Sequence, residues 1–570
     1  MSFSEYFRVH RRLPAGDSVL PAFPVQLAAV LTLHAAALIV MATTEVAVIS
    51  KLVFLLAWGI LNFFWLMVSR RPTVSAALSL AMIVALVLVS RLKHDILLIT
   101  VNFVDLMIID TDTVSFLLGL YPGLRRDLLI AAGVALPLLV WLWRIDPYRI
   151  RMRVAAAGAG SCLAGLTAIC FVSPIHNYEA FFGDSFVSKF VRSGVGAVSE
   201  LVTHGLLESD PVADGALGPA ATRSCPAAEK RPHIIMVLDE SSFDITAVPG
   251  VRVPAGYRDH FGSFDGKHRE FVVEGTGGPT WYTEYNVLTG LSARSFGHFA
   301  YFVTRIAAGR VTRGLPGALR HCGYKTFTLY PAAGAFLSAR SFQTTTGIGR
   351  FIDAHEMAAN GAEPDAFYYD NAARLIARER GAAPLFVFVY LAANHFPWDE
   401  RYRPELTPGW HALGNAEKVD EYVRRQTISA RDYRDFVARL KRDFPGEPFL
   451  LVRFGDHQPE FAERIIDPAL DEDAIARRVQ ARDPRFFTTY YAIDAVNFHP
   501  VDLSSALDTL EAPYLPLVIQ EAAGLPLDPS FAEQKRILRR CGGTFYLCGG
   551  GAEARRFNRL LIDAGLIKNL

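Results

Sequence analysis

Five long apolar segments in the first 175 residues constrain this chain more than any other feature of its sequence. Each approaches the roughly 20 residues that an α-helix needs to cross a bilayer. The segments are Phe23–Thr43, Leu52–Val68, Val74–Val89, Leu128–Trp143 and Val154–Val172. Hydrophobic residues make up 51% of the chain, and their excess is concentrated here. The sequence therefore predicts a membrane domain of about five helices over residues 1–174.

The basic residues predict how these helices are oriented, because Lys and Arg gather in the loops that stay in the cytoplasm. With the N-terminus inside, the inner ends hold the larger set, which is Arg8, Arg11, Arg12, Arg70, Arg71, Arg144, Arg149, Arg151 and Arg153. The outer ends hold Lys51, Arg91, Lys93, Arg125 and Arg126. No small-residue cleavage site follows the first apolar run, which favours a retained anchor over a signal peptide. Five crossings then place the chain after Val172 outside the cytoplasm.

The apolar stretch Asp95–Leu120 is interrupted by Asp105, Asp110 and Asp112. Charges are costly at the bilayer centre, so we expect an interfacial or re-entrant helix here. The alternative is a sixth span, which would turn the second half of the chain inward.

Residues 175–231 are expected to connect two domains. Ile175–Leu207 has apolar residues at helical spacing, which predicts amphipathic helices on the membrane surface. Glu208–Arg231 is rich in Ala, Pro, Gly and Asp and has the composition of a linker.

From residue 232 to residue 570, apolar runs alternate with amphipathic segments. The expected strands are Ile234–Leu238, Thr326–Tyr330, Leu385–Leu391, Phe449–Phe454 and Phe487–Ile493. The expected helices include Gly314–Cys322, Phe367–Arg380, Ser429–Phe444, Tyr514–Ala523 and Phe531–Arg540. This alternation predicts a soluble α/β domain with a mostly parallel sheet that helices cover on both faces. A net charge of +1 argues against a nucleic-acid partner.

Three of the expected strands end in residues that can bind a metal. The first runs into Glu240, the strand in FLLVRFGDHQ runs into Asp456 and His457, and the strand in LFVFVYLAANH runs into His395. Ligands of open α/β sheets collect at the carboxyl ends of the strands. The sequence therefore predicts a metal-centred active site. Asp239 or Asp244 could serve as the ligand in place of Glu240.

A glycine-rich loop precedes a second candidate group, in the stretch EGTGGPTWYTEYNVLTG at Glu274–Gly290. Thr280 is the first residue able to start a helix there, so its hydroxyl should lie where backbone N–H groups favour anions. A hydroxyl in that place can attack a phosphoryl group. The alternative is that Thr280 only caps the helix, and that Trp281, Tyr282 and Tyr285 belong to the core.

The motifs DESSFD, GPTWYTEYNVLTG, NHFPW and FGDHQ follow one another in this order. Together they resemble the lipoteichoic acid synthase and phosphoethanolamine transferase branch of the alkaline phosphatase/sulfatase superfamily. The resemblance covers the second domain and extends to the five-span anchor. It implies an alkaline phosphatase/sulfatase-like fold in a bacterial inner membrane, with the catalytic domain facing the periplasm.

The resemblance implies a role for each matching residue. Glu240 matches the first metal carboxylate, and Thr280 matches a threonine nucleophile that also touches the metal. Asp456 and His457 match the remaining metal ligands. Two carboxylates, an imidazole and a hydroxyl suit one Zn²⁺ or Mn²⁺ ion, with Mg²⁺ as a further candidate.

The residues expected at the substrate are His395 and Arg340. His395 in NHFPW matches a histidine that contacts the headgroup; the alternative is an ordinary loop histidine. Lipoteichoic acid synthases carry a Trp-x-Arg element for glycerol phosphate after the strand that matches Thr326–Tyr330. Here the region reads FLSAR, with Leu337 at the place of the tryptophan and Arg340 shifted by one residue. The sulfatase signature Cys/Ser-x-Pro-x-Arg is absent around Thr280, which argues against a formylglycine sulfatase.

The resemblance implies a membrane-anchored transferase. It would take a phosphoglycerol or phosphoethanolamine headgroup from phosphatidylglycerol or phosphatidylethanolamine, hold it on Thr280 and pass it to a glycan or lipid acceptor of the envelope. One alternative is a phosphodiesterase or phosphatase of the same superfamily, and another is a non-catalytic membrane sensor. Cys541 and Cys548 could close a small disulfide loop in an oxidising compartment, or stay unpaired.

Overall fold

The computed structural model describes residues 22–97, 100–108, 118, 122–175, 183–212, 215–218, 225–227 and 231–570. The chain divides into two compact units, Met1–Val202 and Thr203–Leu570, and each is described by itself. The basic residues before residue 22, together with Asp110, Asp112 and much of the expected linker, lie outside the described residues.

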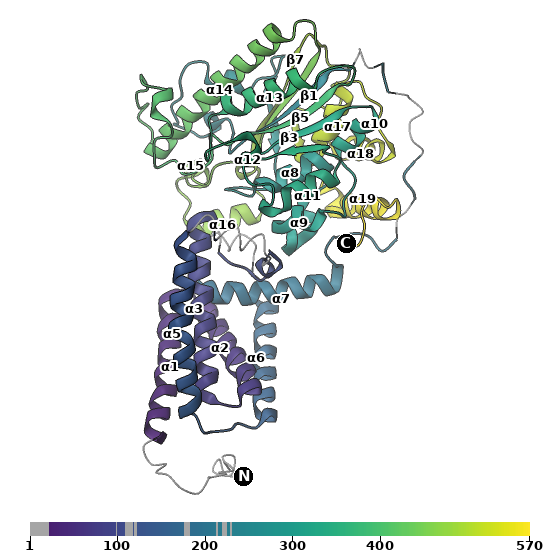
Figure 1. Ribbon diagram of the computed structural model, residues 1–570. Helices are drawn as coiled ribbons and strands as arrows, with labels where there is room; N and C mark the ends of the chain where they lie inside the picture. The colour runs from purple at the N-terminus through teal and green to yellow at the C-terminus, as the bar shows by residue number, and fades with distance from the viewer. Residues whose placement is uncertain are drawn as a thin grey trace. The chain divides into compact units, whose positions relative to one another are not determined.

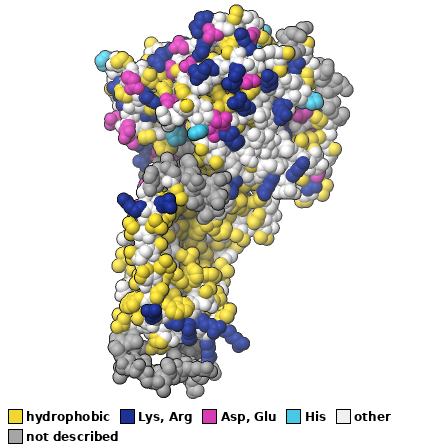
Figure 2. Space-filling view, viewed as in Figure 1, with side chains coloured by type: hydrophobic (Ala, Val, Ile, Leu, Met, Phe, Trp, Pro, Cys, Tyr) yellow, Lys and Arg dark blue, Asp and Glu magenta, His cyan; other side chains and the backbone are white. Residues whose placement is uncertain are grey.

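Five helices of the first unit are long and apolar enough to cross a membrane, as expected. They are α1 Ala22–Thr44, α2 Val48–Ser69, α3 Pro72–Leu97, α5 Pro122–Ile145 and α6 Met152–Val172. Most of their side chains face outward, and Figure 2 shows these outer surfaces covered by apolar side chains. Such a surface suits lipid and not water, and the predicted set of about five apolar helices is confirmed.

Two further segments belong to this unit. The described part of the stretch after α3 holds the short 3-10 turn η2 Phe103–Ile108, and residues 109–117 lie outside the described residues. Asp105 forms an ion pair with Lys93 at 2.8 Å. Helix α7 Phe186–His204 falls within the expected amphipathic stretch. Its residues Phe186 and Val187 pack in one apolar cluster with residues of α2 and α3.

The second unit is built on one eight-stranded sheet in the order β4-β3-β5-β1-β6-β7-β2-β8. Its strands are β1 His233–Asp239, β2 Arg269–Val272, β3 Lys325–Leu329, β4 Arg350–Ile352, β5 Leu385–Tyr390, β6 Phe449–Gly455, β7 Thr488–Val496 and β8 Thr509–Glu511. Only β7 runs antiparallel to its neighbours, so the sheet is mostly parallel as predicted. In the register, Leu238 pairs with Tyr390 and with Phe454, so β1, β5 and β6 end side by side.

Helices cover both faces of this sheet (Figure 1). On one face, Ile235 and Val237 of β1 pack with Tyr368 of α13 Asp365–Glu379 and Phe436 of α14 Glu417–Asp443. The opposite face carries α8 Thr280–Thr289, α10 Leu315–His321, α17 Leu515–Ala522 and α18 Pro529–Cys541. The other helices are α9 Val303–Ala307, α11 Ala339–Thr345, α12 Ala354–Met357, α15 Ala462–Ile466, α16 Glu472–Gln480 and α19 Ala552–Asp563. Every residue of β1, β5 and β6 is buried, which explains their continuous apolar runs.

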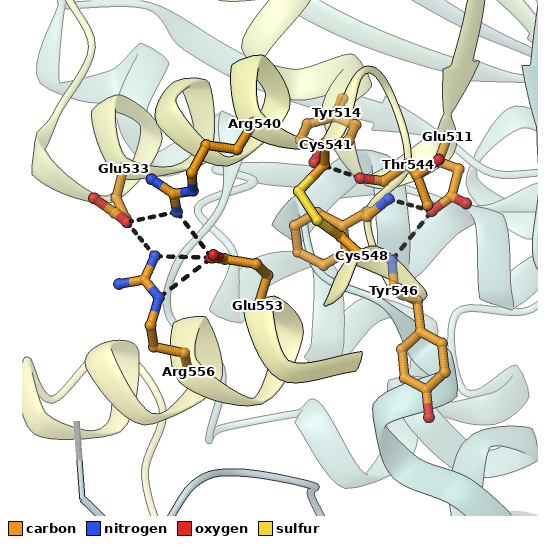
Figure 3. Close-up of a disulfide and its surroundings, with 11 residues drawn as sticks. Glu511, Tyr514, Glu533, Arg540, Cys541, Thr544, Tyr546, Cys548, Glu553 and Arg556 are labelled. Atoms are coloured by element: carbon orange, nitrogen blue, oxygen red, sulfur yellow. Dashed lines mark hydrogen bonds and ion pairs between the residues drawn. A yellow bond between two sulfur atoms is a disulfide. The ribbon is translucent and has the colours of Figure 1, made fainter. Parts of the chain in front are cut away.

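Two disulfides stabilise the second unit. Cys541 at the end of α18 is bonded to Cys548, with their Cα atoms 5.7 Å apart. This bridge closes a loop whose Phe545 and Tyr546 backbone N–H groups donate to Glu511. Figure 3 shows the bridge together with Tyr546 and Glu511. Cys225 is bonded to Cys322, which is 97 residues away. Sequence spacing could suggest the first bridge but not the second.

Replacing both Cys541 and Cys548 by serine should lower the free energy of unfolding of the second unit by about 2.5 kcal/mol, because an open chain regains the entropy of a loop of roughly eight residues. Urea denaturation of the detergent-solubilised chain, followed by near-UV circular dichroism, measures this. The double variant of Cys162 and Cys170, which are free, is the control. Equal stability of the two double variants would contradict the prediction.

Candidate metal centre

Successive side chains of a β-strand point to opposite sides, and this alternation separates the two adjacent acids at the end of β1. Asp239 is the last residue of β1, and Glu240 follows it on the opposite side. Ser241 adopts a positive φ of 51°, which turns the chain sharply after Glu240. The Ser241 hydroxyl then donates to Oε1 of Glu240 at 2.9 Å. Glu240 is 4% exposed, so its carboxylate is held in a buried position.

The end of β6 brings the second pair of candidate ligands to the same place. Gly455 is required there, because a Cβ atom at this position would lie 1.8 Å from the backbone oxygen of Ser242. This close approach lets the Ser241 N–H donate to Oδ1 of Asp456 at 2.7 Å. The backbone oxygen of Asp456 accepts a hydrogen bond from the Thr283 hydroxyl of α8. The loops after β1 and β6 and the first turn of α8 are thereby tied together.

Glu240, Asp456 and His457 form a cluster whose potential ligand atoms all lie within 4.8 Å of one another. His457 Nε2 lies 3.2 Å from Oδ2 of Asp456 and 3.5 Å from Oε1 of Glu240. It also lies 3.2 Å from Oγ1 of Thr280. Three oxygen atoms therefore surround one imidazole nitrogen.

The hydrogen bond at Nδ1 of His457 determines whether Nε2 carries a proton or a lone pair. His457 Nδ1 lies 2.8 Å from the backbone oxygen of Gln458, and a carbonyl oxygen can only accept, so Nδ1 carries the proton. In the neutral ring, Nε2 then presents its lone pair to the carboxylates of Glu240 and Asp456. An imidazole lone pair beside two carboxyl groups and the Thr280 hydroxyl is a donor set that can share one cation.

The electrostatics of the cluster also fit a cation. Burial, and after it the charge of Asp456, raises the pKa of Glu240 to about 8. Burial likewise raises the pKa of Asp456, while hydrogen bonds from the Thr280 hydroxyl and the Ser241 N–H act in the opposite direction. Two buried carboxylates so close together repel each other, and a divalent cation offsets both charges. Two carboxylates, an imidazole and a hydroxyl form a donor set that a divalent metal accepts.

Thr280 begins α8, and its side chain does not cap that helix. Pro279 occupies the N-cap position, without a side-chain hydrogen bond to the first turn. The Thr280 hydroxyl instead faces His457, with a longer contact of 3.4 Å to the backbone oxygen of Gly278. The side chain is 7% exposed. The structure thus brings Thr280 together with the three candidate ligands.

Asp239 and Asp244, the alternatives to Glu240, make other contacts. Oδ2 of Asp239 accepts from Tyr490 at 2.5 Å and lies 2.9 Å from Nε2 of His260. Burial alone would raise the pKa of Asp239, but the hydrogen bonds from His260 and Tyr490 lower it. Asp244 caps the 3-10 turn after β1 by accepting from the Thr246 N–H. Neither acid belongs to the cluster.

His260 and its partners were missed by the sequence analysis. Nδ1 of His260 accepts from Arg453 of β6, which leaves Nε2–H to donate to Asp239. Arg453 stacks over Tyr433 at 3.8 Å, and all these side chains are buried. The group anchors β1 to β6 directly behind the cluster. His260 lies in a 3-10 turn without an apolar run before it, so the strand-end pattern could not identify it.

The two residues expected at the substrate are not members of the cluster of Glu240, Asp456 and His457. His395 has an exposed side chain, and its Nδ1 lies 2.9 Å from the backbone oxygen of Phe396. Surrounding protein atoms lower the pKa of His395, while the charge of Asp456 acts in the opposite direction. Arg340 pairs with Asp353 at 2.7 Å and Glu356 at 2.9 Å. Substrate binding by Arg340 would compete with these two carboxylates.

Glu284, one turn after Thr280 in α8, is a further buried acid. Its Oε1 accepts from Gln343 at 2.8 Å, and Gln343 in turn accepts from Thr328 of β3. Burial raises the pKa of Glu284 to about 8. The neutral side chain therefore links α8, α11 and β3 at neutral pH.

The stability of the chain should depend on pH through Glu284. The unfolded chain loses this proton near pH 4.5, and the folded chain keeps it until about pH 8. Unfolding therefore releases a proton in this window, and the free energy of unfolding falls by up to about 1.4 kcal/mol per pH unit as pH rises. In Glu284→Gln this contribution disappears. Urea denaturation of wild type and Glu284→Gln at pH 5.5, 6.5 and 7.5 gives the contribution of Glu284 as the difference between their free energies of unfolding. A difference that does not change with pH would contradict the raised pKa of Glu284.

Part of the second unit is similar to known proteins. Residues 271–498 match the Sulfatase family model. A capsular polysaccharide biosynthesis protein of Rhizobium meliloti (strain 1021) is 27% identical over 263 residues, which cover 43% of this chain. The chain spans about half the length of this curated relative, with 45% of it matched.

Several solved structures are similar at low identity. A Streptococcus pyogenes phosphoglycerol transferase in complex with sn-glycerol-1-phosphate is 14% identical, with a TM-score of 0.45 over 62% of this chain and 100% of that chain. The integral membrane lipooligosaccharide phosphoethanolamine transferase A of Neisseria meningitidis is 12% identical, with a TM-score of 0.43 over 84% of this chain and 96% of that chain. A lipoteichoic acid synthase of Listeria monocytogenes is 15% identical, with a TM-score of 0.40 over 54% of this chain and 76% of that chain.

Proposed function

We propose that this chain, a membrane protein with a sulfatase-family domain, is a metal-dependent transferase of phospholipid headgroups. It takes phosphoglycerol or phosphoethanolamine from phosphatidylglycerol or phosphatidylethanolamine and passes it to a glycan or lipid acceptor of the cell envelope. The observation that carries the proposal is the meeting of Thr280 with Glu240, Asp456 and His457 in one buried cluster.

In the first half-reaction, Oγ1 of Thr280 attacks the phosphorus of the lipid. The new Thr–O–P bond forms as the bond from phosphorus to the diacylglycerol oxygen breaks. The proton of the Thr280 hydroxyl ends on that leaving oxygen, so the products are a phosphodiester on Thr280 and diacylglycerol. A divalent ion held by Glu240, Asp456 and His457 would lower the pKa of the Thr280 hydroxyl and neutralise phosphate charge.

In the second half-reaction, a hydroxyl of the acceptor attacks the same phosphorus. The bond from phosphorus to Oγ1 breaks, and the acceptor proton returns to Thr280. Water can replace the acceptor, and the outcome is then hydrolysis. His395 and Arg340 are proposed to contact the headgroup or its phosphate.

The disulfides and the orientation expected for the membrane helices both support a reaction outside the cytoplasm. Both disulfides of the second unit are typical of an oxidising compartment, such as the periplasm. The distribution of basic residues favours the same orientation. We propose a bacterial inner membrane with the catalytic domain outside, where the lipid donor is met in two dimensions.

The proposal is tested by turnover of the two lipids, labelled in the headgroup, by the full-length chain in detergent micelles. We expect diacylglycerol to form with either Mn²⁺ or Zn²⁺ and not after chelation. Labelled glycan or lipid in membrane extracts would identify a transferase, and free headgroup phosphate with no labelled acceptor would identify the hydrolase. No turnover with metal bound would contradict both.

A further inference from the structure

The indole of Trp281, directly after the proposed nucleophile, is buried with an unpaired donor. The side chain is 8% exposed, and its Nε1–H has no hydrogen-bond partner within the described part of the chain. Leaving a buried donor unpaired costs about 1–3 kcal/mol, and buried Trp N–H groups usually find an acceptor. An indole nitrogen can only donate, so the missing partner is an acceptor atom.

Two further aromatic rings line the same place. The Trp281 ring meets Tyr301 edge to face, with centroids 4.8 Å apart. Phe336 lies 6.3 Å from Trp281, again edge to face. Tyr301 comes from the 3-10 segment η7 Ala293–Phe302, and Phe336 from η8 Phe336–Ser338, in the loop that follows β3. The three rings form one aromatic cluster, which contains the unpaired Trp281 N–H and the hydroxyl of Tyr301.

The backbone beside Phe336 is held in an unusual conformation. Leu337 and Ser338 have positive φ values of 45° and 60°. Non-glycine residues in this region cost on the order of 1 kcal/mol or more, and they cluster at functional sites. The Thr304 hydroxyl holds the turn by donating to the backbone oxygen of Leu337 at 2.8 Å. The turn holds Phe336 next to Leu337, which occupies the place of the tryptophan of lipoteichoic acid synthases.

The glycerol and ethanolamine groups differ in whether they can accept a hydrogen bond from the Trp281 N–H. A glycerol hydroxyl can accept a hydrogen bond from an indole N–H. The ammonium group of ethanolamine has three donors and no acceptor, so it would leave the Trp281 N–H unpaired. An ammonium can instead lie against the face of an aromatic ring.

We propose that Trp281, with Tyr301 and Phe336, forms a subsite for a neutral polyol, in which the Trp281 N–H donates to a hydroxyl oxygen of the glycerol headgroup. This inference rests on the proposed function and makes phosphoglycerol the preferred group. Trp281 is a specificity residue in this account, and Thr280 performs the chemistry.

The test compares three substrates of the full-length chain in micelles with metal bound: phosphatidylglycerol, phosphatidylethanolamine and bis(p-nitrophenyl) phosphate. The last is a diester without a polyol. We expect wild type to prefer phosphatidylglycerol over phosphatidylethanolamine by about tenfold in kcat/KM, the value of one hydrogen bond. Trp281→Phe keeps a ring and removes the donor. In this variant the ratio of kcat/KM for phosphatidylglycerol to that for the diester should fall about tenfold, through KM.

The matched control is Tyr285→Phe. It removes a hydroxyl that is also buried and unpaired, one turn further along α8 and stacked on Phe342. Its substrate ratios should equal those of wild type, and unfolding midpoints should show that both variants fold.

The outcomes separate the two proposals. Diester turnover with an unchanged ratio in Trp281→Phe would mean that the N–H meets only the Tyr301 ring, and a wild-type preference for phosphatidylethanolamine would favour an ammonium against the rings. Either result would overturn the polyol subsite and leave the proposed function standing. No turnover of any substrate by metal-bound wild type would overturn the proposed function itself.

Discussion

Replacing Thr280 by alanine should lower headgroup transfer at least about 10³-fold, as expected when a nucleophile is removed. The alanine variant has no oxygen to form the phosphodiester. The metal should stay bound, because Glu240, Asp456 and His457 remain. Rates of diacylglycerol release, with metal content measured on the same sample, test both statements.

Two variants control for the position of the hydroxyl. Thr280→Ser keeps an oxygen and should retain measurable transfer. Thr289→Ala makes the same chemical change at the other end of α8, where the hydroxyl donates to the backbone oxygen of Tyr285 and accepts from the Leu291 N–H. It should transfer at the wild-type rate. Normal transfer by Thr280→Ala would show that another group attacks the phosphorus.

Replacing Asp456 by asparagine should weaken metal binding at least about 100-fold. Asparagine keeps an oxygen to accept from the Ser241 N–H and removes the charge. In the metal-free protein this change also relieves repulsion with Glu240, so the metal-free variant should be at least as stable as metal-free wild type. Added metal at about 100 times the wild-type Kd should stabilise wild type by about 2.7 kcal/mol and the variant hardly at all.

Calorimetric titration with Mn²⁺ and Zn²⁺ measures the affinity, and thermal unfolding with and without metal measures the stability. Asp244→Asn is the matched control, because Asp244 also follows β1 but caps a turn. Metal binding lost in Asp244→Asn and kept in Asp456→Asn would place the ion elsewhere.

The interior of the sheet could be predicted from the sequence because of its burial. Strands β1, β5 and β6 are buried on both faces and therefore appear as continuous apolar runs. The strands β2, β4 and β8 have only three or four residues and include polar ones, so no pattern distinguishes them from loops. The antiparallel direction of β7 depends on its connection and not on its composition.

The meeting of the site residues followed from strand ends, but their fine geometry did not. Parallel strands end at one edge of the sheet, and that rule brings Glu240 next to Asp456. Whether Asp239 or Glu240 joins the cluster depends on where His260 lies, because His260 contacts Asp239. The sequence around His260 is a loop without a periodic pattern. The ion pair of Arg340 could not be predicted without knowing where Asp353 lies. The disulfide of Cys225 could not be predicted without knowing where Cys322 lies. Each of these depends on where distant segments meet.

The most direct test of the central claim is peptide mass spectrometry of the full-length chain after incubation with metal and either phosphatidylglycerol or phosphatidylethanolamine. The account predicts a metal-dependent adduct on the peptide that carries Thr280, with the mass of glycerophosphoryl or phosphoethanolamine, and no adduct in Thr280→Ala. An adduct on a different residue, or no adduct in a sample that holds metal and releases diacylglycerol, would contradict it.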